Sequence, residues 1–362
     1  MSSVLLPVPQ VPGTTEAPVP GAVTAAADGR RVLGDRFGRV ATDLRVSLID
    51  RCNLRCTYCM PAEGLDWLDS DQLLTDQEFL RLINIGTSLL GIRTIRLTGG
   101  EPLLRKGLEG LVAGIAALDD RPKIALTTNG IGLARRAQGL ADAGLDRINI
   151  SLDTLDPTIF EQLSRRRRLP DVLAGVEAAQ RAGLQPVKIN SVLMRGINDH
   201  EAVPLVRWAM QQGVQLRFIE QMPLDAQHGW DRNQMITAEE IAAMLGREFE
   251  LVEDPADRAA RGSAPAELFR IAGTDHRVGI IAAVSKPFCA ACDRVRLTAD
   301  GQLRNCLFAR TEQDLRGPLR SGATDDQLAD QWVSAVSRKL PGHGIDDPSF
   351  LQPDRPMSAI GG

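Results

Sequence analysis

Apolar and polar positions alternate along the first two thirds of the chain in a way that predicts strands and helices in turn. Six short runs, apolar and β-branched and bounded by Gly, Asp or Pro, predict strands at 44–49, 93–98, 123–128, 147–152, 187–193 and 215–220. Helical periodicity between them predicts helices at 76–90, 104–118, 133–143, 170–182 and 201–212. Thr75 followed by Glu78 is a capping-box pattern at the first of these helices.

Strands that alternate with helices indicate a parallel sheet with right-handed crossovers. The number of strands favours an open partial (β/α)6 TIM-like barrel over a closed barrel of eight strands. In both folds the loops that follow the strands share one rim, and we expect the chemistry there.

The alternation fades after residue 223. We expect a helix at 238–245, short strands at 268–271, 278–283, 295–298 and 303–307 that pair antiparallel, and a last helix at 325–337. The sequence therefore predicts an α/β fold in four parts. These are a disordered Pro-rich leader (1–35), a partial barrel (36–223), a smaller C-terminal α+β appendage (224–340) and an extended tail (341–362) that ends in Gly-Gly.

Composition excludes several classes of protein. Of the 362 residues, 43% are hydrophobic and 24% are charged, which is typical of a globular chain and not of a fully disordered one. No apolar run approaches the roughly 18 residues of a membrane-spanning helix, and a net charge of −4 argues against a general nucleic-acid coat. We expect neither a membrane nor a nucleic acid as partner.

The six cysteines form two triads. Residues 1–29 contain none of the Lys or Arg residues that a signal or transit peptide carries. A reducing, cytoplasmic location is therefore expected, where clustered cysteines more often hold metal than pair with each other. Cys52, Cys56 and Cys59 follow the first predicted strand in a CxxxCxxC pattern with no fourth Cys or His nearby. A structural zinc site needs four ligands, whereas an iron–sulfur cluster held by three cysteines leaves one iron open. A zinc knuckle completed by a distant ligand is the alternative.

Cys289, Cys292 and Cys306 form the second triad, also without a local fourth cysteine. A second cluster with an open iron, facing the mouth of the barrel, is one interpretation. A zinc site completed by His276, thirteen residues before Cys289, is the other.

Several basic residues share faces of predicted strands. Arg294 and Arg296 lie at strand spacing, as do Arg45 and Ser47. Arg96 and Thr127 end strands two and three, and Lys188 lies within strand five, where a buried charge needs an anionic partner or a shifted pKa. Each basic residue alone is more simply a solvated charge. Together they predict a polyphosphate site at the barrel mouth.

The CxxxCxxC pattern, with Tyr58 before its last cysteine, resembles the signature of the radical S-adenosylmethionine superfamily. The resemblance implies that the open iron binds S-adenosylmethionine and that one electron cleaves it to a 5′-deoxyadenosyl radical. It also implies contacts to S-adenosylmethionine from Tyr58, from Gly100 of the GGEP segment, from Ser151 and from Met222.

Segments 43–61 (DLRVSLIDRCNLRCTYCMP) and 95–105 (IRLTGGEPLLR), the distal CxxC-x13-C and the terminal Gly361-Gly362 resemble the GTP 3′,8-cyclase family of molybdenum cofactor biosynthesis. The implied enzyme is a lyase with two [4Fe-4S] clusters and S-adenosylmethionine. Its radical removes hydrogen from C3′ of GTP, and the carbon radical attacks C8 to give 3′,8-cyclo-7,8-dihydro-GTP.

By position, the family's substrate contacts fall on Arg45, Arg96, Thr127, Lys188, Arg294, Val295 and Arg296. Gly361 and Gly362 would enter the catalytic pocket beside Arg296. Thr94 stands where family members often carry a lysine, and Arg93 is a candidate substitute for that phosphate contact.

The implied partners are GTP, a flavodoxin or ferredoxin as electron donor, a second copy of the chain in a homodimer, and the downstream cyclic pyranopterin monophosphate synthase. Two other functions stay open. One is a radical S-adenosylmethionine enzyme that modifies peptides and carries an auxiliary iron–sulfur cluster. The other is a non-catalytic zinc or ferredoxin-like scaffold.

Overall fold

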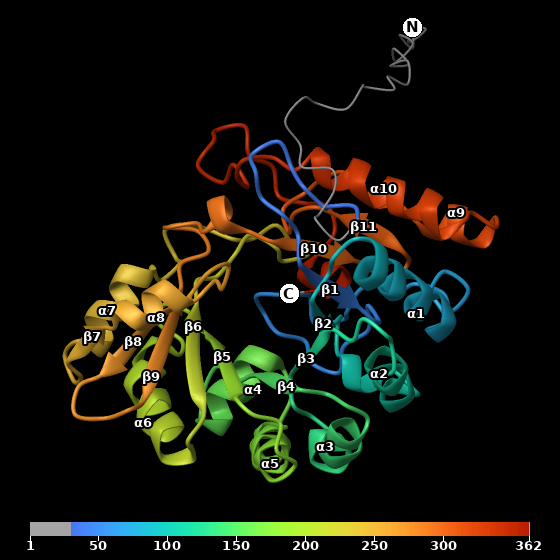
Figure 1. Cartoon of the computed structure of the whole chain (residues 1–362). Helices are drawn as coiled ribbons and strands as arrows, with labels where there is room; N and C mark the ends of the chain where they lie inside the picture. Colours follow the sequence, from blue (N-terminus) through green and yellow to red (C-terminus); the bar gives the residue numbers. More distant parts are fainter. Residues whose placement is uncertain (1–29, 362) are drawn as a thin grey trace, which may run out of the picture.

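All six predicted barrel strands form in the computed structural model, which describes residues 30–361. The strands are β1 (Asp43–Ser47), β2 (Thr94–Thr98), β3 (Lys123–Thr128), β4 (Arg147–Ser151), β5 (Val187–Val192) and β6 (Gln215–Ile219). They pair in parallel and in chain order. The helices of the crossovers lie along the outer side of the curved sheet (Figure 1). The prediction of a partial TIM-like barrel is confirmed.

The barrel helices are α1 (Asp76–Asn84), α2 (Leu108–Ala116), α3 (Leu133–Asp142), α4 (Pro157–Ser164), α5 (Leu169–Arg181) and α6 (Ala202–Gln212). The helix predicted at 76–90 changes at Ile85 into a π-helical turn, Ile85–Leu89. The one predicted from residue 104 begins at Leu108, because Gly107 before it has a left-handed φ of 73°. α4 was missed, although Asp156 caps it and Pro157 opens it.

The barrel strands have a mainly apolar outer face and a mainly polar inner face. Leu44 and Val46 of β1 are fully buried in the core between sheet and helices, as are Ile95 and Leu97 of β2. The residues between them, such as Arg45, point into the barrel. Burial of the outer face stabilises the fold, and the inner face is left for polar chemistry.

The C-terminal part extends the same sheet at both edges. Its elements are α7 (Ala238–Leu245), β7 (Leu251–Glu253), α8 (Pro255–Ala260), β8 (Glu267–Ile271), β9 (Arg277–Ile281), β10 (Arg294–Leu297), β11 (Gln302–Arg304), β12 (Gln313–Asp314), α9 (Arg316–Arg320), α10 (Asp325–Ser337) and α11 (Met357–Ile360). Over the described residues the sheet has twelve strands in the order β12-β11-β10-β1-β2-β3-β4-β5-β6-β9-β8-β7.

Antiparallel pairing was expected throughout this part, and for two strands that was wrong. β9 pairs in parallel with β6, and β10 in parallel with β1, because each continues a barrel edge instead of starting a new hairpin. The pairs β7–β8, β8–β9, β10–β11 and β11–β12 are antiparallel as expected.

The predicted leader lies mostly outside the described residues, and so does Gly362. From Arg30 on the chain packs against the rest, with Leu33 fully buried. The tail is not extended throughout, since α11 forms one helical turn whose Ile360 is buried. The end of the described chain lies at the centre of the molecule, close to β1 (Figure 1).

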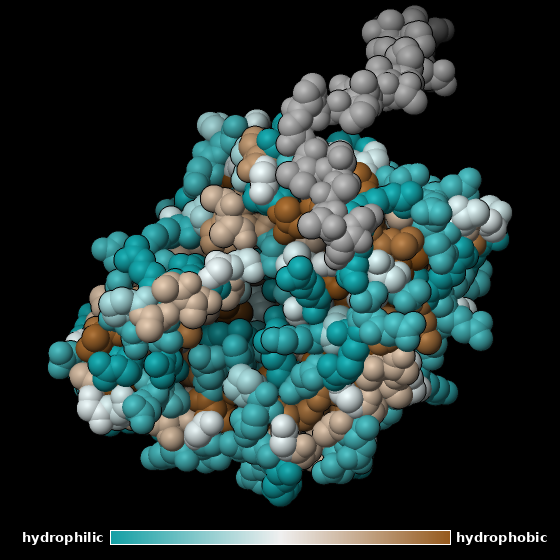
Figure 2. Space-filling model, in the orientation of Figure 1, coloured by the Kyte–Doolittle hydropathy of each residue, from teal (hydrophilic) through white to brown (hydrophobic). Residues whose placement is uncertain are grey.

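The face shown in Figure 2 is mostly hydrophilic, with apolar residues scattered over it. Among residues 30–361, none of the helices combines the length and the apolar character needed to cross a bilayer.

Candidate active site

A cavity of about 330 Å³ lies inside the curved sheet, a volume within the range of small-molecule sites. Its wall is made by inward-facing side chains of the barrel strands, by β10 and by the loop of the first cysteine triad. The predicted contacts to S-adenosylmethionine all line it, as do most of the predicted substrate contacts. These lining residues are Tyr58, Gly100, Ser151, Met222, Arg45, Arg96, Thr127, Arg294 and Arg296.

The first triad occupies the loop after β1, and its three thiols lie close enough to interact electrostatically. Burial raises the pKa of Cys52 to about 11 and that of Cys59 to about 12, and it raises the pKa of Cys56 well above its usual value. Thiols this buried ionise when a metal centre supplies positive charge. The donor set therefore fits an iron–sulfur cluster.

Tyr58 joins the triad loop to the far side of the cavity. Its hydroxyl donates a 2.6 Å hydrogen bond to Asp153 Oδ2, and Asp153 Oδ1 accepts one from the backbone of Val192. Burial raises the pKa of Asp153 to about 6. Asp153 was not given a role from the sequence, although it follows Ser151 by two residues. It fixes the aromatic ring beside the cysteines.

The glycines of the GGEP segment let β2 leave the sheet directly behind the triad loop. Gly99 has a φ of 144°, and a Cβ there would lie 3.1 Å from the backbone nitrogen of Ile49. A Cβ at Gly100 would collide with the carbonyl oxygens of Asp50 and Arg51. Only glycine fits here, so the backbone of this segment reaches the cavity wall.

Glu101 closes the same turn. Its carboxylate accepts hydrogen bonds from Thr128 Oγ1 and from the backbone nitrogens of Asn129 and Leu103, at 2.7–2.9 Å. Burial raises its pKa to about 7. Glu101 thus ties the ends of β2 and β3 together beneath the triad.

Three arginines form a row across β10, β1 and β2, with Arg45 directly paired to both Arg296 and Arg96. Burial, followed by the charges of Arg96 and Arg294, lowers the pKa of Arg45 to about 9. Burial likewise lowers the pKa of Arg96 to about 10 and that of Arg296 well below its ordinary value. Within residues 30–361 the Nε atoms of Arg45 and Arg96 have no hydrogen-bond partner. Like charges placed opposite one another in a sheet are destabilising, so this row is suited to a multiply charged anion.

Lys188 and Val295 do not sit with this row. Lys188 lines a neighbouring cavity of about 230 Å³, and burial lowers its pKa to about 8. The side chain of Val295 is fully buried beside Leu44 in the core, so only its backbone is available to a ligand. Arg294 donates to the Ser263 carbonyl and stacks on the Phe288 ring, with Cζ 4.7 Å from the ring centroid.

Sequence reasoning missed Arg217, which lines both cavities. Its Nε and Nη2 donate to Asn190 Oδ1 at 3.0 and 2.6 Å, and burial lowers its pKa to about 10. Its place two residues after Gln215 in β6 was the available signal. Arg93, by contrast, is exposed and lies outside the cavity lining, so it does not substitute for a lysine at Thr94.

The second triad lies at the amino ends of the strands, whereas the first triad lies on the rim at their carboxyl ends. The strand pairing places Arg294 opposite Asp43, and Arg39 Nη1 donates to the Cys289 carbonyl. The cysteines precede β10, which runs parallel to β1, so they stand at the other end of the cavity. The expectation that the second triad faces the same barrel mouth as the first was wrong for this reason.

The thiols of this triad have different electrostatic surroundings from those of the first. Burial raises the pKa of Cys289. At Cys292 burial acts in the same direction, but the charges of Lys339 and Arg294 outweigh it and the pKa is lowered.

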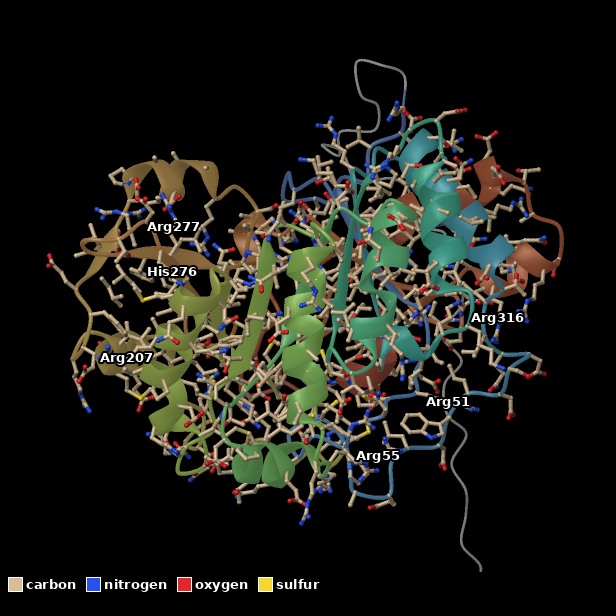
Figure 3. The ribbon with its side chains drawn as sticks, turned by 90° about the horizontal axis from the view of Figure 1, so that it is seen from below. Arg51, Arg55, Arg207, His276, Arg277 and Arg316 are labelled. Carbon is tan, nitrogen blue, oxygen red and sulfur yellow. The ribbon has the colours of Figure 1, made fainter. Side chains whose placement is uncertain are left out.

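The zinc alternatives find no support in the geometry. Across residues 30–361, no three His, Cys, Asp or Glu side chains are grouped so as to hold one metal ion. Cysteines that hold an iron–sulfur cluster bind different irons, so their sulfurs stand farther apart than sulfurs that bind one zinc ion. His276, the ligand considered for the second triad, lies in the turn between β8 and β9 and is not grouped with those cysteines. It also lies well away from Arg51 and Arg55 of the first triad loop (Figure 3).

The tail reaches the cavity: Met357 and Ser358 line it, and Gly361 contacts Arg296 of its wall, while Gly362 lies outside the described residues. The Gly361 carbonyl accepts a hydrogen bond from Arg296 Nη1. Gly361 has a φ of 73°, and a Cβ there would lie 3.1 Å from Ser47 Oγ. The backbone nitrogen of Ser358 also donates to the Cys59 thiol. The tail therefore passes between the first triad and the arginine row.

Comparisons with known proteins agree with this geometry. Residues 46–209 match the family model of the radical SAM superfamily, and residues 214–345 match that of Molybdenum Cofactor Synthesis C. A GTP 3′,8-cyclase of Streptomyces coelicolor is 60% identical over 94% of this chain and 99% of its own length. The chain belongs to the GTP 3′,8-cyclase family. A GTP 3′,8-cyclase of Mycolicibacterium smegmatis is 56% identical over the full length of both chains.

Solved structures show the same fold at low identity. Streptococcus suis SuiB bound to S-adenosylmethionine aligns with a TM-score of 0.56 and 13% identity, over 90% of this chain and 77% of that one. The protein anSMEcpe with bound AdoMet aligns with a TM-score of 0.55 and 13% identity, over 86% of this chain and 81% of that one.

Proposed function

We propose that the chain is a lyase that converts GTP to 3′,8-cyclo-7,8-dihydro-GTP in molybdenum cofactor biosynthesis. The observation that carries this is the buried row of Arg296, Arg45 and Arg96 inside a cavity with a cysteine triad toward each end. Asp43, 4.0 Å from Arg45 Nε, is one carboxylate beside three guanidinium groups. The row therefore needs further negative charge, and a triphosphate supplies several negative charges at this spacing.

Cys52, Cys56 and Cys59 would hold one [4Fe-4S] cluster, and Cys289, Cys292 and Cys306 the other. When bound at the first cluster, S-adenosylmethionine supplies the one-electron chemistry that removes a hydrogen atom from the ribose of GTP. Tyr58, Gly100, Ser151 and Met222 line the wall where it would lie.

The protein's own contribution is binding and orientation. Arg45, Arg96 and Arg296 bind the triphosphate, and Arg217 and Lys188 extend the cationic surface into the neighbouring cavity. Thr127 lies beside Asn149, whose Nδ2 donates to Thr127 Oγ1 at 3.2 Å. We assign contact with the sugar to these neutral groups. The Gly361 carbonyl on Arg296 limits how that guanidinium can turn.

We extend the proposal to the partners that the family resemblance implied. These are a flavodoxin or ferredoxin as electron donor, a homodimer, and cyclic pyranopterin monophosphate synthase as the enzyme that consumes the product. A cytoplasmic location is supported by six cysteines that form no disulfide.

The test is anaerobic reconstitution followed by incubation with S-adenosylmethionine, a reductant and GTP. Two [4Fe-4S] clusters require about eight irons per chain, and GTP should be consumed with formation of the cyclised product. Formation of 5′-deoxyadenosine without GTP consumption would favour the peptide-modifying alternative. Neither reaction, with bound zinc, would favour the scaffold.

A further inference from the structure

A buried lysine touches the second triad and has no part in the proposed function above. Lys339 follows α10 and is 4% exposed. Its Nζ donates to Cys292 Sγ at 3.4 Å, to the Cys292 carbonyl at 3.2 Å and to the Arg294 carbonyl at 2.9 Å. Three acceptors use all three protons of the ammonium group, which fixes its position against the cysteine.

Within residues 30–361, no carboxylate forms an ion pair with this charge. The Lys339 Nζ bonds to two carbonyl oxygens and to the sulfur of Cys292, which is the partner that carries negative charge when it is a thiolate. A buried unpaired ammonium is costly. The arrangement is favourable only when the sulfur carries negative charge, as a metal-bound thiolate does.

The residues after Lys339 hold the same triad. Arg39 donates to the carbonyls of Leu340, Pro341 and Cys289 at 2.6, 3.0 and 2.8 Å. The backbone nitrogen of His343 donates to the Cys289 thiol. Residues 339–343 therefore supply hydrogen bonds to two of the three cysteine sulfurs, although they lie more than thirty residues after Cys306.

We propose that Lys339 sets the reduction potential of the second cluster through a charge-assisted N–H···S hydrogen bond to Cys292. Reduction adds one negative charge to the cluster, and a fixed positive charge at a ligating sulfur stabilises the reduced state more than the oxidised one. Lys339 is thus a positioning and tuning residue. The inference rests on the second cluster of the proposed function.

The experiment is a redox titration of the reconstituted full chain, followed by electron paramagnetic resonance. A chain with all three cysteines of the first triad replaced by alanine assigns the second cluster's signal. Lys339→Met keeps the length of the side chain without its charge. We expect it to lower the potential of the second cluster by about 59 mV, a tenfold change in a one-electron equilibrium, and to leave that of the first cluster unchanged.

Two further variants complete the design. Lys339→Arg retains charge and donors and should stay near the wild-type potential. Arg338→Met, one residue away on the exposed surface, is the matched control and should change neither potential.

An occupied second cluster with an unchanged potential in Lys339→Met overturns the inference. If Lys339→Met retains too little of the cluster to titrate, Lys339→Arg decides. If Lys339→Arg retains the second cluster at the wild-type potential, the inference is supported. If Lys339→Arg loses as much of the cluster as Lys339→Met does, the inference is overturned. Wild-type chain with only about four irons would instead contradict the proposed function.

Discussion

The two cysteine triads differ in the charge that surrounds them. At the first triad burial raises the thiol pKa values most, and the buried carboxylates Glu101 and Asp153 raise them further. At the second triad, Lys339 and Arg294 act on Cys292 in the opposite sense. The cavity therefore has an acidic end and a basic end. A sulfonium compound such as S-adenosylmethionine suits the first, and a polyphosphate suits the second.

The triads also differ in how the chain builds them. The first is carried by one loop of eight residues after β1. The second combines residues 289–292, Cys306, Arg39 and the segment 339–343. A local loop needs little of the fold to bring its sulfurs together, whereas the second site exists only when distant segments have packed.

Cys306→Ala should have the largest effect and tests whether the basic end is a cluster site. We expect bound iron to fall from about eight to about four per chain and cyclisation of GTP to be abolished. S-adenosylmethionine binding at the acidic end should persist. Iron analysis, ligand binding and product assay measure the three quantities. Normal GTP turnover in this variant would contradict the role given to the second triad.

Arg45→Met tests whether the arginine row binds substrate at a cost in stability. Loss of one charge-assisted contact should weaken GTP binding by ~10–100-fold. Without GTP the variant should be ~1–2 kcal/mol more stable in urea, because a buried cation between two others is removed. Arg310→Met, on the exposed surface, is the control for both measurements. A variant that is less stable and binds GTP normally would show that the row is structural.

Asp153→Asn tests the acidic end through pH. Burial raises the pKa of Asp153 from 3.8 to about 6, so the folded chain holds a proton that the unfolded chain releases. The stability from this group is present below pH 3.8 and is lost as pH rises through about 6. The variant should therefore gain ~1–3 kcal/mol at pH 7 relative to wild type and little near pH 4.

Urea unfolding of the metal-free chain at several pH values measures this difference. Asp354→Asn, an exposed position, is the control. If the free energy of unfolding changes with pH in the same way for wild type and Asp153→Asn, the raised pKa of Asp153 is refuted.

Thr94→Lys should have the smallest effect. Thr94 precedes Arg96 by two residues on the inner face of β2 and pairs with Asp43. A lysine there adds one partly solvated charge, worth ~0.2–1 kcal/mol, so the KM for GTP should fall by less than about fivefold. Arg93→Met should leave KM unchanged, because Arg93 is exposed. A large rise in KM for Arg93→Met would return the phosphate contact to that residue.

Local patterns were enough to predict the barrel and most of its cavity. The alternation that defines a strand also gives the face of each side chain, so Arg45 with Ser47 and Arg294 with Arg296 could be placed together. The capping box at Thr75 was confirmed. Arg217 could have been found by the same alternation, since it shares a face of β6 with Gln215.

Long-range pairing could not be predicted in this way. Nothing within residues 294–297 indicates that β10 joins β1 in parallel, and that pairing moves the second triad to the amino ends of the strands. Contact between Lys339 and Cys292 likewise depends on how α10 packs, which hydrophobic periodicity does not specify. The left-handed Gly107 that delays α2 is a backbone choice that neighbouring residues impose.

The arginine row has a practical consequence for experiments in air. Its three guanidinium groups need neither iron nor an electron donor to attract an anion. Inorganic tripolyphosphate should therefore raise the melting temperature of aerobically purified chain, since a ligand that binds only the folded state stabilises it by mass action. Differential scanning fluorimetry can then screen competitors of the nucleotide without a glove box.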